Sequence, residues 1–299
     1  MKIVVTGVTG QIGSRIAEYL SKDHEVIATV RNSGIPLPYS VAEMDLANPA
    51  SIFNLIKSAR PDIVIHAAAI TSPEICDKDR SLCTKINLEG TRRLAEACGE
   101  FSAKMVYLST DLVFDGNGSL YTEDDIPNPL SVYAESKLKG EIAVRELLEN
   151  SVVARTSIVF GKGIFREDGF TYWLIGNLAK RKKLELYTDQ YRSHFYIGDC
   201  ARAVAELALK KLKGLYHLSS GNRESRYDFA MKVAKHLSLD GTLIIPAKME
   251  MHGDMAKRPK DCSLDNRKLL RDTDFELLPE GEAFKLLAED YSEYQKMAN

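Results

Sequence analysis

No stretch of the sequence reaches the roughly 18 to 20 consecutive apolar residues that a membrane-spanning helix needs, so a membrane is not an expected partner. The chain starts with the strand-like run MKIVVTG and lacks the basic-then-apolar layout of a signal peptide, so we expect a cytoplasmic protein. The formal net charge is only −2, which leaves no basic field for nucleic acid. The five cysteines form no Cys-x-x-Cys pair and the six histidines no His-x-x-x-His pair, so we expect reduced thiols and no metal site.

Residues 1–157 alternate short β-branched runs with helical stretches. The strand-like runs stand at 2–7, 24–30, 61–68, 103–110 and 151–157, with helical stretches such as 11–22 and 86–101 between them. Nearly continuous apolar strands separated by helices indicate an α/β fold with a doubly wound parallel sheet, the Rossmann arrangement. Ligands bind at the carboxyl ends of the strands in such sheets.

Beyond residue 157 the alternation loosens into loops, helices and short strands. Helical stretches are expected at 170–182, 199–211, 225–237 and 279–294, and strand-like runs at 184–187, 215–218 and 243–245. With no repeat and no low-complexity linker, residues 158–299 are predicted to form a smaller substrate-binding lobe that is interleaved with the sheet.

The run TGVTGQIG follows the first strand and opens the first helix. Its glycines, Gly7, Gly10 and Gly13, let backbone N–H groups approach a pyrophosphate at the positive end of the helix. A glycine trio alone is a weak signal, but its place between a strand and a helix supports a dinucleotide-binding domain over residues 1–157.

The end of the second strand bears on the choice of dinucleotide. Arg31 stands where an acidic residue would bind the ribose 2′-hydroxyl of NAD, and a guanidinium pairs instead with the 2′-phosphate of NADP. The alternative is a solvated loop arginine. Asp45 and Leu46 follow a short third strand and are predicted to flank the adenine.

Tyr133 and Lys137 lie four residues apart in SVYAESKLKGE, which predicts one face of a helix. A cation about 4 Å away in a partly desolvated site is worth about 4 kcal/mol, enough to bring a phenol pKa towards neutrality. A hydroxyl that holds a substrate carbonyl is expected at the end of the neighbouring strand, where Ser109 and Thr110 stand. The alternative is that Tyr133 and Lys137 are solvent-exposed side chains of a surface helix with no role in catalysis.

Several motifs in this order resemble the extended short-chain dehydrogenase/reductases. They are the glycine turn, HAAA, STDLVFDG, NPLSVYAESKLKGE and RTSIVFG. Within that family the chain is most similar to the dTDP-4-dehydrorhamnose reductases and to their relative, the methionine adenosyltransferase beta subunit. The similarity runs nearly end to end, including DQYRS at 189–193 and AKRPKDCSLDNRKL at 256–269.

The resemblance implies a role for each matched residue. Tyr133 is the implied catalytic acid/base, Lys137 tunes it and binds the nicotinamide ribose, and Thr110 orients the substrate carbonyl. The implied pyrophosphate loop and the segment beside the cofactor comprise Gly7, Gly10, Gln11, Ile12, Gly13, Ala67 and Ala68. Asn87 matches a helix asparagine of the family, with helix capping as the alternative.

The resemblance also implies an activity, the NADPH-dependent reduction of a 4-keto nucleotide sugar. Its most specific form converts dTDP-4-dehydro-L-rhamnose to dTDP-L-rhamnose, with NADP(H) as the cofactor and NAD(H) as the alternative. A regulatory subunit that binds NADP without turning over a sugar, and a nucleotide-sugar epimerase, are the competing interpretations. A homodimer is left open.

The substrate side departs from the family pattern. Leu112 replaces a usual aromatic residue and Ile158 a usual tryptophan, so the identity of the sugar stays open. Asp111, Arg192 and Arg258 are candidate substrate contacts, the two arginines for a diphosphate. A loop salt bridge is the alternative for each arginine.

Overall fold

The computed structural model describes residues 1–31, 37–165, 169–251 and 258–298, and its centre is a seven-stranded sheet. The strand order is β11-β6-β5-β4-β1-β2-β3, and every neighbouring pair is parallel. The strands are β1 (Lys2–Thr6), β2 (Glu25–Val30), β3 (Ser40–Glu43), β4 (Ile63–His66), β5 (Lys104–Thr110), β6 (Ser151–Thr156) and β11 (Gly214–Leu218). The chain order reverses between β1 and β4, the switch point beside which such sheets bind ligands.

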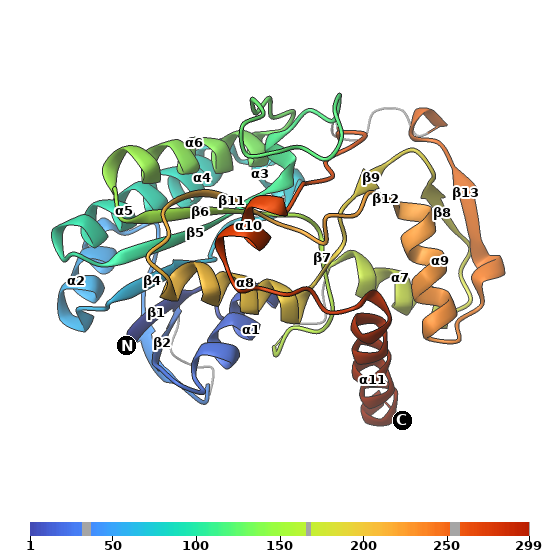
Figure 1. Cartoon of the computed structure of the whole chain (residues 1–299), viewed down its shortest axis with the longest axis horizontal. Helices are drawn as coiled ribbons and strands as arrows, with labels where there is room; N and C mark the ends of the chain where they lie inside the picture. The colour runs from blue at the N-terminus through green and yellow to red at the C-terminus, as the bar shows by residue number, and fades with distance from the viewer. Residues whose placement is uncertain (32–36, 166–168, 252–257, 299) are drawn as a thin grey trace.

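Helices cover both faces of this sheet (Figure 1). One face carries α1 (Gln11–Leu20) and α8 (Ile197–Leu209), and the other carries α2 (Pro49–Ala59), α5 (Thr91–Glu100) and α6 (Val132–Leu147). Successive strand residues point to opposite faces, so Ile3 and Val5 of β1 belong to one buried cluster and Val4 to the other. The predicted doubly wound parallel sheet is confirmed.

The helix expected at 86–101 is divided in two. A π-helix spans Thr84–Gly90, and α5 follows from Thr91. The short helices α3 (Pro73–Lys78) and α4 (Arg80–Cys83) precede it. Periodicity alone does not separate a π-helical turn from an α-helical one, because both bury one face.

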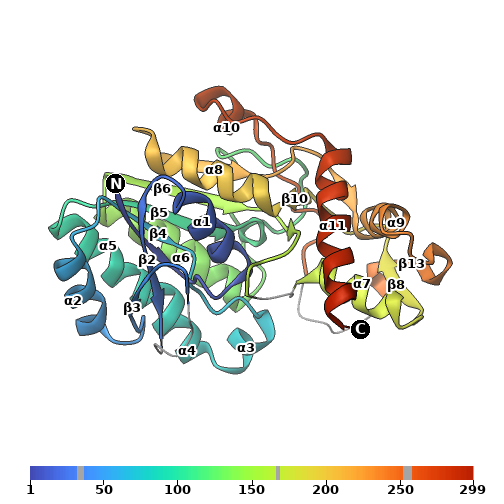
Figure 2. The same ribbon diagram turned by 90° about the horizontal axis from the view of Figure 1, so that it is seen from below.

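A smaller lobe lies beside the sheet and contains its own apolar core (Figure 2). Phe160, Phe229 and Phe284 meet there, with the ring centroid of Phe160 5.4 Å from each of the other two. The remaining elements of this half are β7 (Val159–Phe160), α7 (Phe170–Ala179), β8 (Leu184–Tyr187), β9 (Tyr191–Arg192), β10 (Phe195–Tyr196), β12 (Glu224–Ser225), α9 (Arg226–His236), β13 (Ile244–Ala247), α10 (Arg267–Asp272) and α11 (Glu280–Ala298). The helix expected at 170–182 ends at Ala179, and Arg181 has a left-handed φ of 55°.

Three elements that follow residue 157 pack with the sheet, namely α8, β11 and α10, whose Leu269 lies in the buried cluster of β1, α1 and α8. Strand β11 pairs with β6 from Gly214 to Leu218, and α8 packs against α1. The chain therefore leaves the sheet after β6, returns for α8 and β11, leaves again for α9, and returns once more for α10, as expected for an interleaved lobe. The division at residue 157 stays a proposal about independent units.

In the part of the chain that the structure describes, no helix is long and apolar enough to cross a membrane. All five cysteines are free and buried. No cluster of three histidine, cysteine or acidic side chains suited to a metal ion occurs among the described residues.

Candidate active site

The glycine turn after β1 forms a backbone cradle. Gly7 has a left-handed φ of 72°, and its carbonyl accepts the Gly10 N–H at 2.9 Å. A Cβ at Gly13 would stand 2.3 Å from the Gly7 oxygen, and a Cβ at Gly7 would stand 2.8 Å from the Ala68 nitrogen. Gly10 caps α1 without a side-chain hydrogen bond, so the first amides of the helix remain available to a ligand. This arrangement fits the pyrophosphate of a dinucleotide.

The segment predicted to lie beside the cofactor is held against this cradle. The N–H groups of Ala67 and Ala68 both donate to Thr6 Oγ1, at 3.1 and 3.0 Å. The Thr6 hydroxyl also contacts Nδ1 of His66, at 2.8 Å. The end of β1 and the end of β4 are therefore joined at the switch point.

The side chains of Gln11 and Ile12 make contacts within the protein itself. Gln11 Nε2 donates to the Gly161 carbonyl at 2.8 Å, and the Ile164 N–H donates to Ser14 Oγ at 3.0 Å. Ile12 packs against the sheet core. The loop after β7 is thus anchored to the start of α1, which leaves the backbone of Gln11 and Ile12 for the predicted pyrophosphate contact.

The residues predicted at the adenosine end lie after β2 and β3. Arg31 is exposed and follows β2 directly. Asp45 uses Oδ1 to accept the Ala47 N–H at 2.9 Å, and Leu46 is buried. Their contacts with a cofactor remain predictions.

Thr110, Tyr133 and Lys137 are brought together at the end of β5 and the start of α6. Helix α6 begins at Val132 because Ser131 caps it, its Oγ accepting the Ala134 N–H at 3.3 Å. Tyr133 and Lys137 are both buried, and the Thr110 hydroxyl is hydrogen-bonded to the Tyr133 phenol. The predicted trio therefore forms one cluster.

The electrostatics of Tyr133 differ from expectation. Burial raises the pKa of the phenol, the Asp111 carboxylate raises it further, and the hydrogen bond with Thr110 lowers it in part. The expectation that Lys137 brings this pKa towards neutrality is wrong for the cofactor-free protein. Burial disfavours the phenolate, and because burial also lowers the pKa of Lys137, that amine has largely lost its charge before the phenol titrates.

Lys137 is itself perturbed by burial. Its Nζ lies 4.0 Å from the centroid of the Tyr107 ring, and burial lowers its pKa to about 7, while the Glu141 carboxylate opposes that shift. Glu141 is held by Arg155, whose Nε and Nη2 lie 3.0 and 2.8 Å from its oxygens, and by the Ser109 hydroxyl. Ser109 therefore faces Glu141, and of the two hydroxyls at the end of β5 it is Thr110 that acts on the Tyr133 phenol.

Asn87 joins the loop after β4 to helix α6 rather than capping a helix. Its Oδ1 accepts the Ile70 N–H at 2.8 Å, and its Nδ2 donates to the Ile70 carbonyl and to Ser136 Oγ, both at 3.0 Å. Ser136, which lies between Tyr133 and Lys137 in the sequence, donates to the Tyr133 carbonyl at 2.7 Å. This buried network fixes the start of α6.

Asp111 and Arg192 form a buried ion pair beside the trio. Arg192 Nε lies 3.6 Å from Asp111 Oδ2, and the Ser157 hydroxyl donates to the same oxygen at 3.4 Å. Burial raises the pKa of Asp111, and the Arg192 guanidinium counteracts this. Arg192 also donates to the Pro259 carbonyl at 3.2 Å. The salt-bridge alternative is thus observed for Arg192, and its contact with a diphosphate stays a prediction.

The remaining substrate candidate is Arg258, and Leu112 and Ile158 are the two positions that depart from the family pattern. Arg258 is exposed, and its Nη2 donates to Glu74 Oε1 of α3 at 3.0 Å. Leu112 is half-buried and packs against the apolar cluster that contains Tyr133. The Ile158 carbonyl accepts the Phe195 N–H at 2.9 Å. A salt bridge is therefore present for Arg258 as well.

Comparison with known proteins agrees with this geometry. A family model described as the RmlD substrate binding domain matches residues 1–292. The chain belongs to this RmlD family. Its relative dTDP-4-dehydrorhamnose reductase of Aggregatibacter actinomycetemcomitans is 31% identical, with 90% of this chain and 92% of that protein covered. Methionine adenosyltransferase 2 subunit beta of Danio rerio is 28% identical, with 90% of this chain and 84% of that protein covered.

A solved structure extends the comparison to three dimensions. The dTDP-4-dehydrorhamnose reductase of Bacillus anthracis, in complex with NADP, superposes on this RmlD-family chain with a TM-score of 0.85. The two are 28% identical, and the match covers 98% of this chain and 99% of the other. Together these findings confirm the predicted family resemblance, the fold and the assignment to the oxidoreductases.

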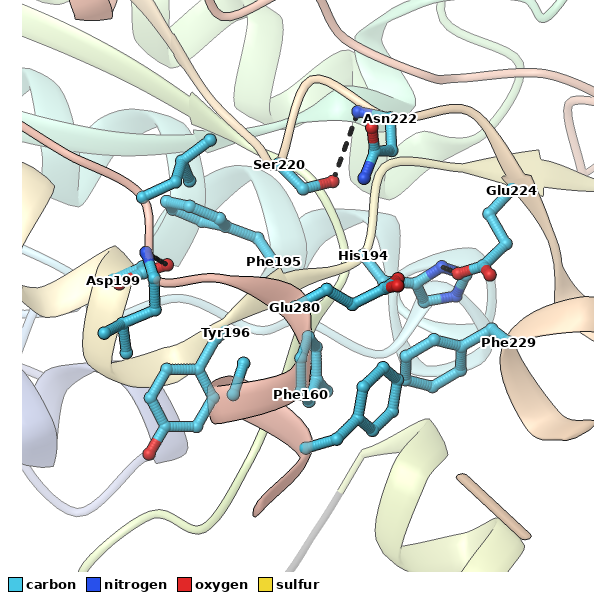
Figure 3. A pocket seen from close by; sticks show the side chains of 14 residues that line it. Phe160, His194, Phe195, Tyr196, Asp199, Ser220, Asn222, Glu224, Phe229 and Glu280 are labelled. Carbon is cyan, nitrogen blue, oxygen red and sulfur yellow. Dashed lines mark hydrogen bonds and ion pairs between the residues drawn. The ribbon is translucent and has the colours of Figure 1, made fainter. Parts of the chain in front are cut away.

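A cavity of about 100 Å³ opens between the lobe and the start of α8, and none of the predicted site residues lines it (Figure 3). The His194 ring stacks on Phe229 with centroids 3.7 Å apart, and burial lowers its pKa to about 4. Lys232 bridges Glu224 and Glu280 at the cavity, with Nζ–O distances of 2.7 and 2.5 Å. The His194 ring is therefore neutral at pH 7, and the Glu224 and Glu280 carboxylates are both paired with Lys232.

Sequence reasoning missed four residues that act on the site: Glu141, Arg155, Ser136 and Arg226, the last through its charge, which counteracts the rise that burial causes in the pKa of Asp111. A local signal existed for Glu141, which follows Lys137 by four residues on the same helix face. Arg155 lies on β6, and Arg226 begins α9. These two reach the site only through tertiary packing, so no spacing in the sequence points to them.

Proposed function

We propose that the chain is an NADPH-dependent reductase of a 4-keto nucleotide sugar, and most specifically of dTDP-4-dehydro-L-rhamnose, giving dTDP-L-rhamnose. The observation that carries the proposal is the meeting of Thr110, Tyr133 and Lys137 at the end of β5, in a fold whose β1–α1 turn forms a glycine cradle. The names of the Aggregatibacter and Bacillus relatives support the substrate. A location in the cytoplasm and a homodimer are part of the same proposal.

The protonation of the site supports reduction. When bound, a reduced nicotinamide supplies the hydride. Because burial and Asp111 raise the pKa of Tyr133, the phenol is protonated at neutral pH, which is the form that a proton donor needs. Thr110 holds the ketone oxygen, and Tyr133 donates its proton to that oxygen. Lys137 then stabilises the phenolate that remains, as a cation on the same helix face.

The cofactor proposal rests on the end of β2 and on the cradle. Arg31 is exposed directly after the strand, where it can pair with the 2′-phosphate of NADPH. The Bacillus anthracis reductase, whose fold this chain shares, was solved in complex with NADP. NAD(H) remains the alternative cofactor.

A single-turnover experiment tests the proposal. NADPH bound to the protein is mixed with dTDP-4-dehydro-L-rhamnose, and its oxidation is followed by absorbance. Tyr133→Phe is expected to keep NADPH binding and to slow oxidation at least about 10²-fold, the lower range for general acid catalysis. Tyr216→Phe is the matched control, because this tyrosine is hydrogen-bonded to Asp272 at the far edge of the sheet. Full activity of Tyr133→Phe would show that the proton comes from another group.

A second candidate is a regulatory subunit that binds NADP. The similarity to the Danio rerio beta subunit favours it, and so do Leu112 and Ile158, which replace aromatic residues on the substrate side. Failure of a panel of 4-keto nucleotide sugars to oxidise bound NADPH, together with a methionine adenosyltransferase co-purifying with the chain, would favour this candidate over the reductase.

A further inference from the structure

Arg226 is a firmly positioned arginine that the proposed reaction does not use. It is the first residue of α9, and its N–H donates to the Gln190 carbonyl at 3.0 Å. Its Nε donates to Gln190 Oε1 at 3.3 Å, and its guanidinium carbon lies 4.2 Å from the centroid of the Phe170 ring. Two contacts therefore fix the plane of the guanidinium.

One nitrogen of this guanidinium lacks a partner. Arg226 Nη1 is buried and makes no hydrogen bond to any residue that the structure describes. An unsatisfied buried donor costs about 1–3 kcal/mol, and more when the group is charged. Such a donor is a candidate to bind a ligand whose oxygen atoms supply the missing acceptor.

The charges around Arg226 favour an anionic ligand. Burial lowers the pKa of Arg226, the cations Arg192 and Arg258 lower it further, and Asp111 is the carboxylate that opposes them. Asp111 already has Arg192 at 3.6 Å, and Arg258 already has Glu74 at 3.0 Å. Arg226, which is half-buried with a buried Nη1, thus shares the Asp111 carboxylate with Arg192, and a bound anion would compensate the remaining positive charge.

Two anionic groups could bind Arg226, the pyrophosphate of the cofactor and the diphosphate of the substrate. The position of Arg226 in the fold favours the second. The cofactor group has the cradle of α1, whose first amides are available. Arg226 belongs to the lobe and acts on Asp111, the neighbour of Thr110, which holds the substrate carbonyl in the proposed reaction. This side of the cluster is the substrate side.

We propose that Arg226 binds the diphosphate oxygens of the nucleotide sugar and thereby selects nucleotide-linked sugars. The assignment of a diphosphate rests on the proposed function. An arginine suits this task because its planar fork can give parallel hydrogen bonds to phosphate oxygens, which a lysine cannot. The contacts with Gln190 and Phe170 orient that fork before the substrate arrives.

The test compares binding of dTDP and of NADPH, each measured by calorimetry on the full chain. Arg226→Met is expected to weaken dTDP binding about 10- to 100-fold, the range for a lost charge-assisted hydrogen bond, and to leave NADPH affinity unchanged. Arg226→Lys keeps the charge without the fork and is expected to give an intermediate loss. It also keeps the test open if the methionine variant does not fold.

Arg223→Met is the matched control. Arg223 stands three residues earlier, is exposed, stacks on Tyr191 and pairs with Asp261 at 2.5 Å, so its loss is expected to leave dTDP binding unchanged. Equal weakening of NADPH and dTDP in Arg226→Met would assign Arg226 to the cofactor and overturn the proposal. Unchanged dTDP binding in both Arg226 variants would overturn it as well.

Turnover separates this inference from the proposed function. The dTDP measurement needs no reaction, so it tests Arg226 even if the chain reduces no sugar. If the chain is a reductase, Arg226→Met is expected to raise KM for the nucleotide sugar with little change in kcat, because the lost contact is made equally in the ground and transition states.

Discussion

Replacing Lys137 with methionine should make the cofactor-free protein more stable while it abolishes reduction. Lys137 is buried, and burial lowers its pKa from 10.5 to about 7. At pH 7 the unfolded chain holds this proton fully and the folded protein holds it only in part. Charging the buried amine therefore costs up to about 4 kcal/mol at pH 7, at about 1.4 kcal/mol for each unit of pKa. Methionine has a similar length and carries no charge.

The pH dependence makes this prediction specific. Below pH 7 both states of the wild type are protonated, and the cost of the buried charge is at its largest. Between pH 7 and the unfolded pKa of 10.5 only the unfolded state is protonated, so the wild type gains stability as the pH rises. The advantage of Lys137→Met should therefore shrink by about 2 kcal/mol between pH 7 and pH 9.

Urea unfolding followed by circular dichroism at pH 7 and pH 9 measures both effects. Lys139→Met is the control, because Lys139 is exposed on the same helix and pairs with Glu135 at 2.7 Å, a surface pair worth at most about 1 kcal/mol. The reasoning is refuted if Lys137→Met lowers stability at pH 7, or if its advantage is the same at both pH values.

Three further predictions follow from the site. Wild type should bind NADPH more tightly than NADH by about 1.5–3 kcal/mol in calorimetry, the range for a charge-assisted hydrogen bond, and Arg31→Ala should remove that preference; equal wild-type affinities would contradict it. Gly13→Ala should abolish NADPH binding, because its Cβ would stand 2.3 Å from the Gly7 oxygen; retained affinity would show that the turn can widen. Glu141→Gln should lower the free energy of unfolding, measured in urea, by about 3–5 kcal/mol, because Arg155 then loses its buried carboxylate partner. A smaller loss in the double variant Glu141→Gln/Arg155→Met would confirm that the unpaired Arg155 is the cause.

The features that depend on short stretches of sequence, such as buried strands and residues on one helix face, could be predicted from the sequence. The β-branched runs became β1, β2, β4, β5 and β6, because a strand buried on both faces needs apolar residues at every position. The pair Tyr133–Lys137 was found for a similar reason, since a spacing of four residues on a helix fixes a shared face.

The electrostatics of the same residues could not be predicted, because burial depends on the whole fold. Tyr133 is covered by α3 and α4 residues Cys76 and Cys83, which are buried around it, and this cover raises the pKa of its phenol. The partner of Asp111 is 81 positions further along the chain, at Arg192. No local spacing in the sequence indicates such pairings. The sequence therefore predicted that Lys137 lowers the pKa of Tyr133, whereas burial raises it.

The opposite shifts of Tyr133 and Lys137 have a common consequence for the proposed reaction. Burial favours the uncharged form of each group, so the resting site holds a phenol that keeps its proton and an amine that is only partly charged at pH 7. Once the phenol has given its proton to a ketone, the new phenolate raises the pKa of Lys137 on the same helix face, and the two groups titrate as a pair. The stabilising charge is then largest when the phenolate exists and smaller before it forms. An interaction that strengthens along the reaction lowers the barrier rather than tightening substrate binding, and burial is what makes Lys137 respond in this way.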